Sequence, residues 1–269
     1  MTMSDPTPDR DEILATLREA ANAARAYTLP RFRTALAVDN KWTTGFDPVT
    51  VADREAETAV REVIARRHPS HGVIGEEWDN VASESRHVWI VDPIDGTRAF
   101  ISGVPVWGTL IGLMAEGRAV AGLMEQPFTG ETWIGLPGGT IHDHSGVIVP
   151  ARTSRETSLA RARISATSPD QFLREDVAPA WQALRAATLQ TRWGLDCYAY
   201  CLLASGHLEI VAESGLKDVD IAPMIPIVEN AGGVVTTWTG GPAEGGGNVI
   251  ASANPALHEA ALRLLSAAL

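Results

Sequence analysis

Residues 89–97 read Trp-Ile-Val-Asp-Pro-Ile-Asp-Gly-Thr and place two carboxylates, Asp92 and Asp95, directly after an apolar run. The apolar run predicts a buried strand, which we expect to end at Pro93 because proline cannot donate to a central ladder. Two carboxylates and the carbonyl oxygen of Ile94 are hard oxygen ligands of the kind that Mg²⁺ accepts. The segment therefore predicts a metal site, although the same string would also suit an ordinary polar turn.

The next two residues, Gly96 and Thr97, favour a phosphate site beside the metal. Glycine lets the backbone approach a ligand closely, and Thr97 stands where a short helix could begin. Free amide hydrogens at a helix start bind anions, so Asp95, Gly96 and Thr97 are the candidate phosphate-binding residues.

Three further acids occupy positions that would suit the same site. Glu76 and Glu77 follow a short strand predicted over 73–75, and because neighbours on a strand face opposite ways, one of them points to the site. Asp53 lies in the first turn of a helix predicted over 51–67, and Asp220 opens a helix predicted over 220–231. Each aspartate could equally be there to cap its helix and complement the helix dipole.

Taken together, these segments resemble the inositol monophosphatase-like family of Mg²⁺-dependent, Li⁺-sensitive phosphatases. The family motif W-x-x-D-P-x-D-G-T-x-x-F is matched without a gap from Trp89 to Phe100, and the upstream G-E-E is Gly75 to Glu77. The later W-D-x-A motif appears in weakened form, since Val219 replaces the usual aromatic residue and Pro223 follows Ala222. Residues 97–103 and 107–110 look most like the bacterial histidinol-phosphate phosphatase branch.

The resemblance implies roles for these residues and about two to three Mg²⁺ ions per active site. The first ion would be bound by Glu76, Asp92 and the Ile94 carbonyl, and the second by Asp92, Asp95 and Asp220. A weaker third ion would use Glu76 and water, with Asp53 nearby as an outer acid. Thr97, hydrogen-bonded to an acid such as Asp53, would help Glu76 to activate the attacking water. No phosphoenzyme is expected, because no cysteine, histidine or free aspartate stands out as a nucleophile.

Two acids outside this set are candidates for substrate recognition. Asp196 stands at the start of a helix predicted over 197–204, where capping is the alternative explanation, and Glu213 ends a strand predicted over 208–212. In the inositol phosphatases the acid that matches Glu213 contacts sugar hydroxyls. In the histidinol-phosphate branch an additional carboxylate would suit a substrate that carries an ammonium group and an imidazole. The sequence gives no role for Lys41 or Arg98.

Composition sets limits on the class of protein. The net charge of −11 argues against binding to nucleic acid or to an anionic membrane surface, and makes metal ions necessary for handling a phosphate ester. No apolar run reaches membrane-spanning length, and the polar residues 1–10 contain no signal core. The two cysteines, Cys197 and Cys201, are four residues apart in an apolar helical segment, which favours reduced core thiols in a cytoplasmic protein.

The pattern along the chain predicts an α+β first half and an α/β second half. Helices are expected over 11–31 and 51–67, a mobile loop over 37–48, and three antiparallel strands over 109–115, 119–125 and 132–136. His142, Asp143 and His144 are expected in a solvated hairpin loop rather than at a metal. From residue 163 onward strands alternate with helices, which include a stretch over 169–185 that is broken near Pro179 and a closing helix over 255–268. With the family resemblance this predicts a layered α-β-α-β-α sandwich that forms one unit, with residues 1–145 carrying most metal ligands and 146–269 completing the site.

The sequence therefore predicts a Mg²⁺-dependent phosphate monoester hydrolase acting on a small phosphorylated metabolite, with histidinol phosphate as the preferred substrate in histidine biosynthesis. The alternatives are an inositol-1-monophosphatase, a fructose-1,6-bisphosphatase or a 3′-phosphoadenosine phosphatase. A metal-binding interaction protein without turnover is the non-enzymatic alternative. Because members of the family are commonly dimeric, a homodimer is expected.

Overall fold

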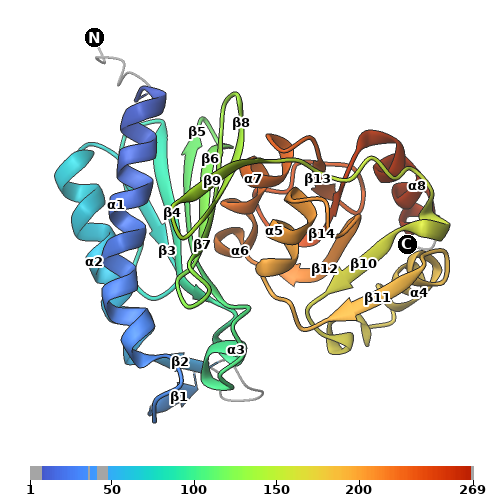
Figure 1. Ribbon diagram of the computed structural model, residues 1–269, viewed down its shortest axis with the longest axis horizontal. Coiled ribbons are helices and arrows are strands. Elements are labelled where there is room, and N and C mark those ends of the chain that lie inside the picture. Colours follow the sequence, from blue (N-terminus) through green and yellow to red (C-terminus); the bar gives the residue numbers. More distant parts are fainter. Residues whose placement is uncertain (1–7, 36, 41–47, 268–269) are drawn as a thin grey trace.

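The computed structural model of the chain describes residues 8–35, 37–40 and 48–267. Its first layer is a pair of helices, α1 (Arg10–Thr28) and α2 (Val51–Arg67), which pack side by side on one face of the larger sheet (Figure 1). Helix α1 begins at Asp9, whose side chain accepts a hydrogen bond from the Glu12 amide, and ends in a 3-10 turn at Leu29–Arg31 that contains Pro30. None of the described helices is both long and apolar enough to cross a bilayer.

The larger sheet has seven strands in the order β3-β4-β5-β6-β7-β8-β9. The strands are β3 (Gly72–Gly75), β4 (His87–Asp95), β5 (Gly108–Ala115), β6 (Arg118–Gln126), β7 (Glu131–Leu136), β8 (Gly139–His144) and β9 (Val147–Ala151). All neighbours are antiparallel except β3 and β4, which run parallel. The three antiparallel strands predicted over 109–136 are confirmed as β5, β6 and β7.

The third layer lies between the two sheets and contains α5 (Tyr198–Ala204), α6 (Asp218–Ile221) and α7 (Met224–Glu229). The fourth layer is a five-stranded sheet in the order β11-β10-β12-β14-β13. Its strands are β10 (Arg163–Ala166), β11 (Gln190–Trp193), β12 (Ile210–Leu216), β13 (Val234–Thr237) and β14 (Gly247–Ser252). Helices α4 (Ala178–Ala186) and α8 (Pro255–Ser266) cover its outer face and share a core with it. This arrangement confirms the predicted α-β-α-β-α sandwich (Figure 1).

Three glycines allow the middle layer to approach the larger sheet closely. Gly112, Gly122 and Gly135 lie opposite one another on β5, β6 and β7. A Cβ atom on Gly122 would stand 1.8 Å from the carbonyl oxygen of Pro223, and one on Gly135 would stand 2.3 Å from the carbonyl carbon of Pro226. Side chains at these positions would push α6 and α7 away from the sheet, so this glycine row determines where Asp220 lies.

Several predicted elements differ in detail from the structure. The helix predicted over 220–231 is divided into α6 and α7, because Pro223 and Pro226 cannot both continue one hydrogen-bonded ladder. The helical stretch predicted over 169–185 is broken near Pro179 as expected, since it is a 3-10 turn, Pro169–Phe172, followed by α4, which has Pro179 in its first turn.

The loop predicted over 37–48 is partly extended. Strand β1 (Val38–Asn40) pairs antiparallel with β2 (Pro48–Thr50), beside α3 (Thr97–Ile101) at one end of the larger sheet (Figure 1). Lys41 and the other residues of 41–47 lie outside the described part of the chain.

The loop predicted at His142, Asp143 and His144 is wrong, because these residues form the end of strand β8. The His142 ring stacks on Trp133 of β7 at 4.2 Å between centroids, which gives the imidazole a packing role. The turn comes one residue later, at Ser145 and Gly146, both in the left-handed region. Strand β9 extends the larger sheet beyond residue 145, and the proposed division of the chain there stays a prediction.

Candidate active site

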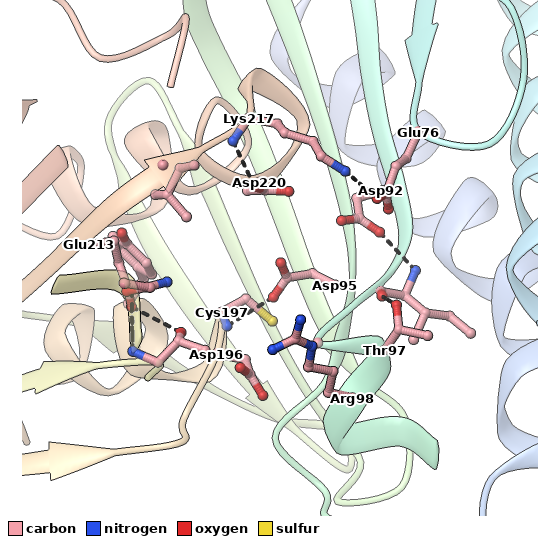
Figure 2. A pocket seen from close by; sticks show the side chains of 17 residues that line it. Glu76, Asp92, Asp95, Thr97, Arg98, Asp196, Cys197, Glu213, Lys217 and Asp220 are labelled. Carbon is pink, nitrogen blue, oxygen red and sulfur yellow. Dashed lines mark hydrogen bonds and ion pairs between the residues drawn. The ribbon is translucent and has the colours of Figure 1, made fainter. Parts of the chain in front are cut away.

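A cavity of about 220 Å³ lies where the middle layer and the smaller sheet meet the end of strand β4 (Figure 2). Both halves of the chain contribute to its lining. The lining residues are Glu76, Asp92, Ile94, Asp95, Gly96, Thr97, Arg98, Thr167, Gln171, Asp196, Cys197, Tyr200, Glu213, Gly215, Leu216, Lys217 and Asp220. Every predicted site residue except Asp53 therefore borders one cavity.

Strand β4 does not end at Pro93 as predicted. It continues to Asp95, and its pairing with β5 is irregular between Asp92 and Asp95. Pro93 lies in this irregular segment, where the strand does not need a hydrogen bond from its backbone nitrogen. The Pro93 carbonyl oxygen accepts a hydrogen bond of 2.9 Å from the Thr109 hydroxyl, and the Ile94 amide donates to Asp92 Oδ1 at 3.0 Å. This irregular segment turns both aspartates toward the cavity.

Asp92, Asp95 and Asp220 form the centre of the site. One carboxylate oxygen from each of them lies within 4.8 Å of those of the other two. Asp92 is buried, and burial together with the charges of Glu76 and Asp95 raises its pKa well above the ordinary value. Burial likewise raises the pKa of Asp220 to about 6. Carboxylates this close repel one another, and hard oxygen donors in this arrangement fit a divalent cation such as Mg²⁺.

Glu76 projects into the cavity as predicted, while Glu77 does not line it (Figure 2). The Glu77 amide instead donates to Glu57 Oε2 at 2.7 Å, and Glu57 is fully buried on α2. Arg61, one turn further along α2, donates to Glu57 Oε1 at 2.7 Å and to the carbonyl oxygens of Trp78 and Asp79 at 3.1 Å. This Glu57–Arg61 pair binds the backbone on the C-terminal side of Glu76.

The predicted hydrogen bond between Thr97 and Asp53 is wrong. Asp53 Oδ2 accepts bonds of 2.8 and 2.6 Å from the amide and hydroxyl of Thr50, and Asp53 Oδ1 has no hydrogen-bond partner. The Thr97 hydroxyl donates to the Ile94 carbonyl oxygen at 3.1 Å. Asp53 caps α2, and burial raises its pKa to about 6. Its role as an outer acid of the metal site stays a prediction.

Gly96 adopts a left-handed conformation, with φ at 80°, and precedes the short helix α3 that was expected to begin at Thr97. A Cβ on Gly96 would lie 3.1 Å from the Asp196 side chain, which explains why the position suits only glycine. The Cys197 amide donates to Asp95 Oδ2 at 2.9 Å. Both cysteines are buried free thiols, as predicted.

The two candidate substrate acids, Asp196 and Glu213, come from the second half of the chain and lie on the side of the cavity away from Glu76 (Figure 2). Asp196 is a non-glycine residue with a left-handed φ of 46°, and burial raises its pKa to about 6 while Arg98 opposes this. Glu213 is buried within β12 rather than at the strand end, and accepts bonds from the Thr167 amide and hydroxyl, both at 3.0 Å. Burial raises the pKa of Glu213 to about 7.

Sequence reasoning missed several residues of the site. Lys217 directs its ammonium nitrogen to within 2.9 Å of Glu76 Oε1, and its amide donates to Asp220 Oδ2 at 2.8 Å. The sequence held a signal for this residue, since the chain has only two lysines and Lys217 stands shortly before Asp220. The i, i+4 spacing of Glu57 and Arg61 was a signal for their pairing, but nothing in the sequence linked them to Glu76.

The model of the inositol monophosphatase family matches residues 9–269. A bifunctional phosphatase of Arabidopsis thaliana named IMPL2 is 39% identical over 81% of this chain, and the match spans 65% of that protein's length. The histidinol-phosphatase of Chlorobaculum parvum is 36% identical, with 93% of this chain and 94% of that protein covered. The solved structure of an inositol monophosphatase from Zymomonas mobilis is 35% identical with a TM-score of 0.85, covering 97% of this chain and 100% of that one.

Proposed function

Because the chain belongs to the inositol monophosphatase family of phosphoric monoester hydrolases, we propose that it hydrolyses histidinol phosphate at a Mg²⁺ centre. The family is Mg²⁺-dependent in general. The observation that carries the proposal is one cavity with a carboxylate cluster on one side, Asp92 with Asp95 and Asp220, and a second pair of acids, Asp196 and Glu213, on the other.

The residues of the cluster have defined parts in this proposal. Asp92, Glu76 and the Ile94 carbonyl would hold one cation, and Asp92, Asp95 and Asp220 would hold a second. Bound Mg²⁺ would neutralise the phosphate dianion, lower the pKa of a water molecule and stabilise the leaving oxygen.

The remaining groups at this end of the cavity orient the reactants. Thr97, held by its bond to the Ile94 carbonyl, positions the attacking water, and Glu76 accepts its proton. The Gly96 and Thr97 amides bind phosphate oxygens at the start of α3. We propose attack by water in line with the leaving group, since both thiols are buried and their pKa values are raised well above the ordinary value.

The residues on the other side of the cavity determine which substrate is preferred. Histidinol phosphate has an ammonium group and an imidazole away from its phosphate, and both are cations or hydrogen-bond donors. Asp196 and Glu213 are acids with raised pKa values in a partly enclosed pocket, where a cationic partner would stabilise their charged forms. Inositol 1-phosphate offers only neutral hydroxyl groups to the same two carboxylates.

A phosphate-release assay with Mg²⁺ tests this proposal across histidinol phosphate, inositol 1-phosphate, fructose 1,6-bisphosphate and 3′-phosphoadenosine 5′-phosphate. Histidinol phosphate is expected to have the highest kcat/KM. Asp196→Asn and Glu213→Gln should each raise KM for it by roughly 10- to 100-fold, the effect of a charge-assisted contact, with a smaller change for inositol 1-phosphate. A wild-type preference for inositol 1-phosphate would overturn the substrate assignment, and absence of turnover on all four would favour a binding protein.

The expectation of a homodimer stands apart from the site, and light scattering of the purified chain measures it directly. We propose a dimer in a reducing cytoplasm on the family resemblance and on the two reduced thiols.

A further inference from the structure

The pair formed by Lys217 and Glu76 joins the two halves of the site (Figure 2). The residues are 141 positions apart, and Lys217 Nζ lies 2.9 Å from Glu76 Oε1. The Glu76 side chain is 13% exposed and the Lys217 side chain 50%, so the protein shields this contact from water on the glutamate side only. Glu76 is not part of the cluster of described acids whose carboxylate oxygens lie within 4.8 Å of one another, which contains Asp92, Asp95 and Asp220. Glu76 is thus directed toward the ammonium group.

The position of Lys217 is determined by the backbone around it. Its amide donates to Asp220 Oδ2, and its carbonyl carbon packs against Gly246, where a Cβ would stand 2.8 Å away. Gly246 has a φ of 76°, so side chains are disfavoured there on conformational grounds as well. The ammonium group is therefore carried on a rigid segment directly before α6.

The choice of lysine is itself unusual in this chain, which has twenty arginines and two lysines. Arginine presents a broad planar fork, whereas lysine presents a compact point charge of one unit. A compact charge beside a carboxylate oxygen resembles a bound metal ion more closely than a guanidinium group does.

We infer that Lys217 takes the place of the weakest of the three Mg²⁺ ions, the one that Glu76 and water would bind, so that the chain holds two divalent ions at saturation. This inference rests on the proposed Mg²⁺ centre. An ion coordinated by Glu76 Oε1 at about 2.1 Å would lie within about 5 Å of the ammonium nitrogen. Two cations that close repel strongly, so the ammonium group occupies the Oε1 side of Glu76 and no divalent ion binds there. The Oε2 atom of Glu76 stays available for the ion that Asp92 and the Ile94 carbonyl would also hold. The ammonium group supplies positive charge there without a dissociable ion.

Counting bound Mn²⁺ by the electron paramagnetic resonance signal of the free ion tests the inference without any assay of activity. Mn²⁺ accepts the same oxygen ligands as Mg²⁺. Wild type should bind two ions per chain. Lys217→Met should bind a third, at least tenfold more tightly than any third ion binds to wild type, and Lys217→Arg, which keeps the charge, should bind two. Arg118→Met is the matched control, because it removes the cation of another half-exposed ion pair, with Glu244, and should leave the count at two.

The outcomes separate this inference from the proposed function. Three ions on wild type, or identical binding curves for wild type and Lys217→Met, would overturn the role of Lys217 and leave the metal centre standing. A third ion on Arg118→Met would also overturn it, since net charge alone would then explain the gain. No ions on wild type would overturn the proposed function itself.

Discussion

Asp92 is the residue on which both proposed cation positions depend. Replacing it by asparagine keeps the shape but removes the charge shared by two ions, so Asp92→Asn should lower phosphate release by roughly 10³-fold or more. The metal-free variant should be at least as stable as wild type, because a buried and repelled carboxylate is gone. Asp11→Asn is the control, since Asp11 is exposed on α1 and does not line the cavity. Phosphate release and thermal melting in EDTA measure the two effects, and retained activity in Asp92→Asn would refute the bridging role.

Thr97 carries a hydroxyl that the structure connects to the Ile94 carbonyl and not to Asp53. If the hydroxyl orients the attacking water, Thr97→Ala should lower kcat about 10²-fold with little change in Mn²⁺ affinity, while Thr97→Ser keeps most of the rate. Steady-state kinetics and metal titration of both variants distinguish this role from a structural one. A wild-type kcat in Thr97→Ala would mean that the threonine only stabilises the turn before α3.

At the scale of elements, helix α2 positions Glu76 through the Glu57–Arg61 pair. Arg61→Met removes the two hydrogen bonds that bind the segment after Glu76. It also leaves the buried Glu57 charge without its cation. We expect the Mg²⁺ concentration needed for half-maximal activity to rise about tenfold. Arg66 is on α2 as well, but its ion pair with Glu19 of α1 is exposed, so Arg66→Met should leave this Mg²⁺ concentration unchanged. Activity measured against Mg²⁺ concentration checks both variants. The same half-maximal Mg²⁺ concentration in Arg61→Met and Arg66→Met would show that the Glu57–Arg61 pair does not position Glu76.

The glycine row under α6 and α7 gives a second prediction at this scale. Gly122→Ala introduces a Cβ that meets the Pro223 carbonyl oxygen, so the α6–α7 segment must shift, at a cost of about 1–3 kcal/mol of unfolding free energy. Because Asp220 moves with α6, Mn²⁺ affinity should fall as well. Gly245→Ala, where nothing lies within 4 Å of the added Cβ, is the control. Chemical denaturation and metal titration measure the two effects, and an unchanged stability would show that the sheet accommodates the methyl group.

These elements also show what the sequence could and could not predict. The strand before Asp92, the helix after Thr50 and the turn at Gly96 depend on neighbouring residues, and their local patterns predicted them well. The passage of β4 through Pro93 depends on pairing with β5, which no local pattern contains. Likewise the contacts of Lys217 with Glu76 and of Thr167 with Glu213 join distant segments, so sequence reasoning found the acids but not the groups that hold them.

At the scale of the whole molecule, the site concentrates carboxylates whose pKa values are raised by burial. In the metal-free chain these values are about 6 for Asp53, Asp196 and Asp220 and about 7 for Glu213. Unfolding returns each to its ordinary value near 4, so the folded state binds more protons than the unfolded state between about pH 4 and pH 7. Stability contributed by these groups is therefore present at low pH and lost as pH rises through that window. His258, with its pKa lowered to about 4 by burial, acts in the opposite direction between about pH 4 and pH 6.5.

Because four acids with these values outweigh one histidine, the metal-free chain should become less stable between pH 5 and pH 8, by roughly 5–10 °C in Tm. Mg²⁺ binds the ionised carboxylates and not the protonated ones, so its stabilising effect should be small at pH 5 and should grow as pH rises. Thermal melting in EDTA and in saturating Mg²⁺ at pH 5, 6, 7 and 8 measures both slopes. Asp92→Asn should reduce the pH-dependent difference between the two conditions, while Asp11→Asn, at an exposed position on α1, should preserve it. An equal Mg²⁺ effect at pH 5 and pH 8 would mean that the raised pKa values of the buried acids do not control metal binding.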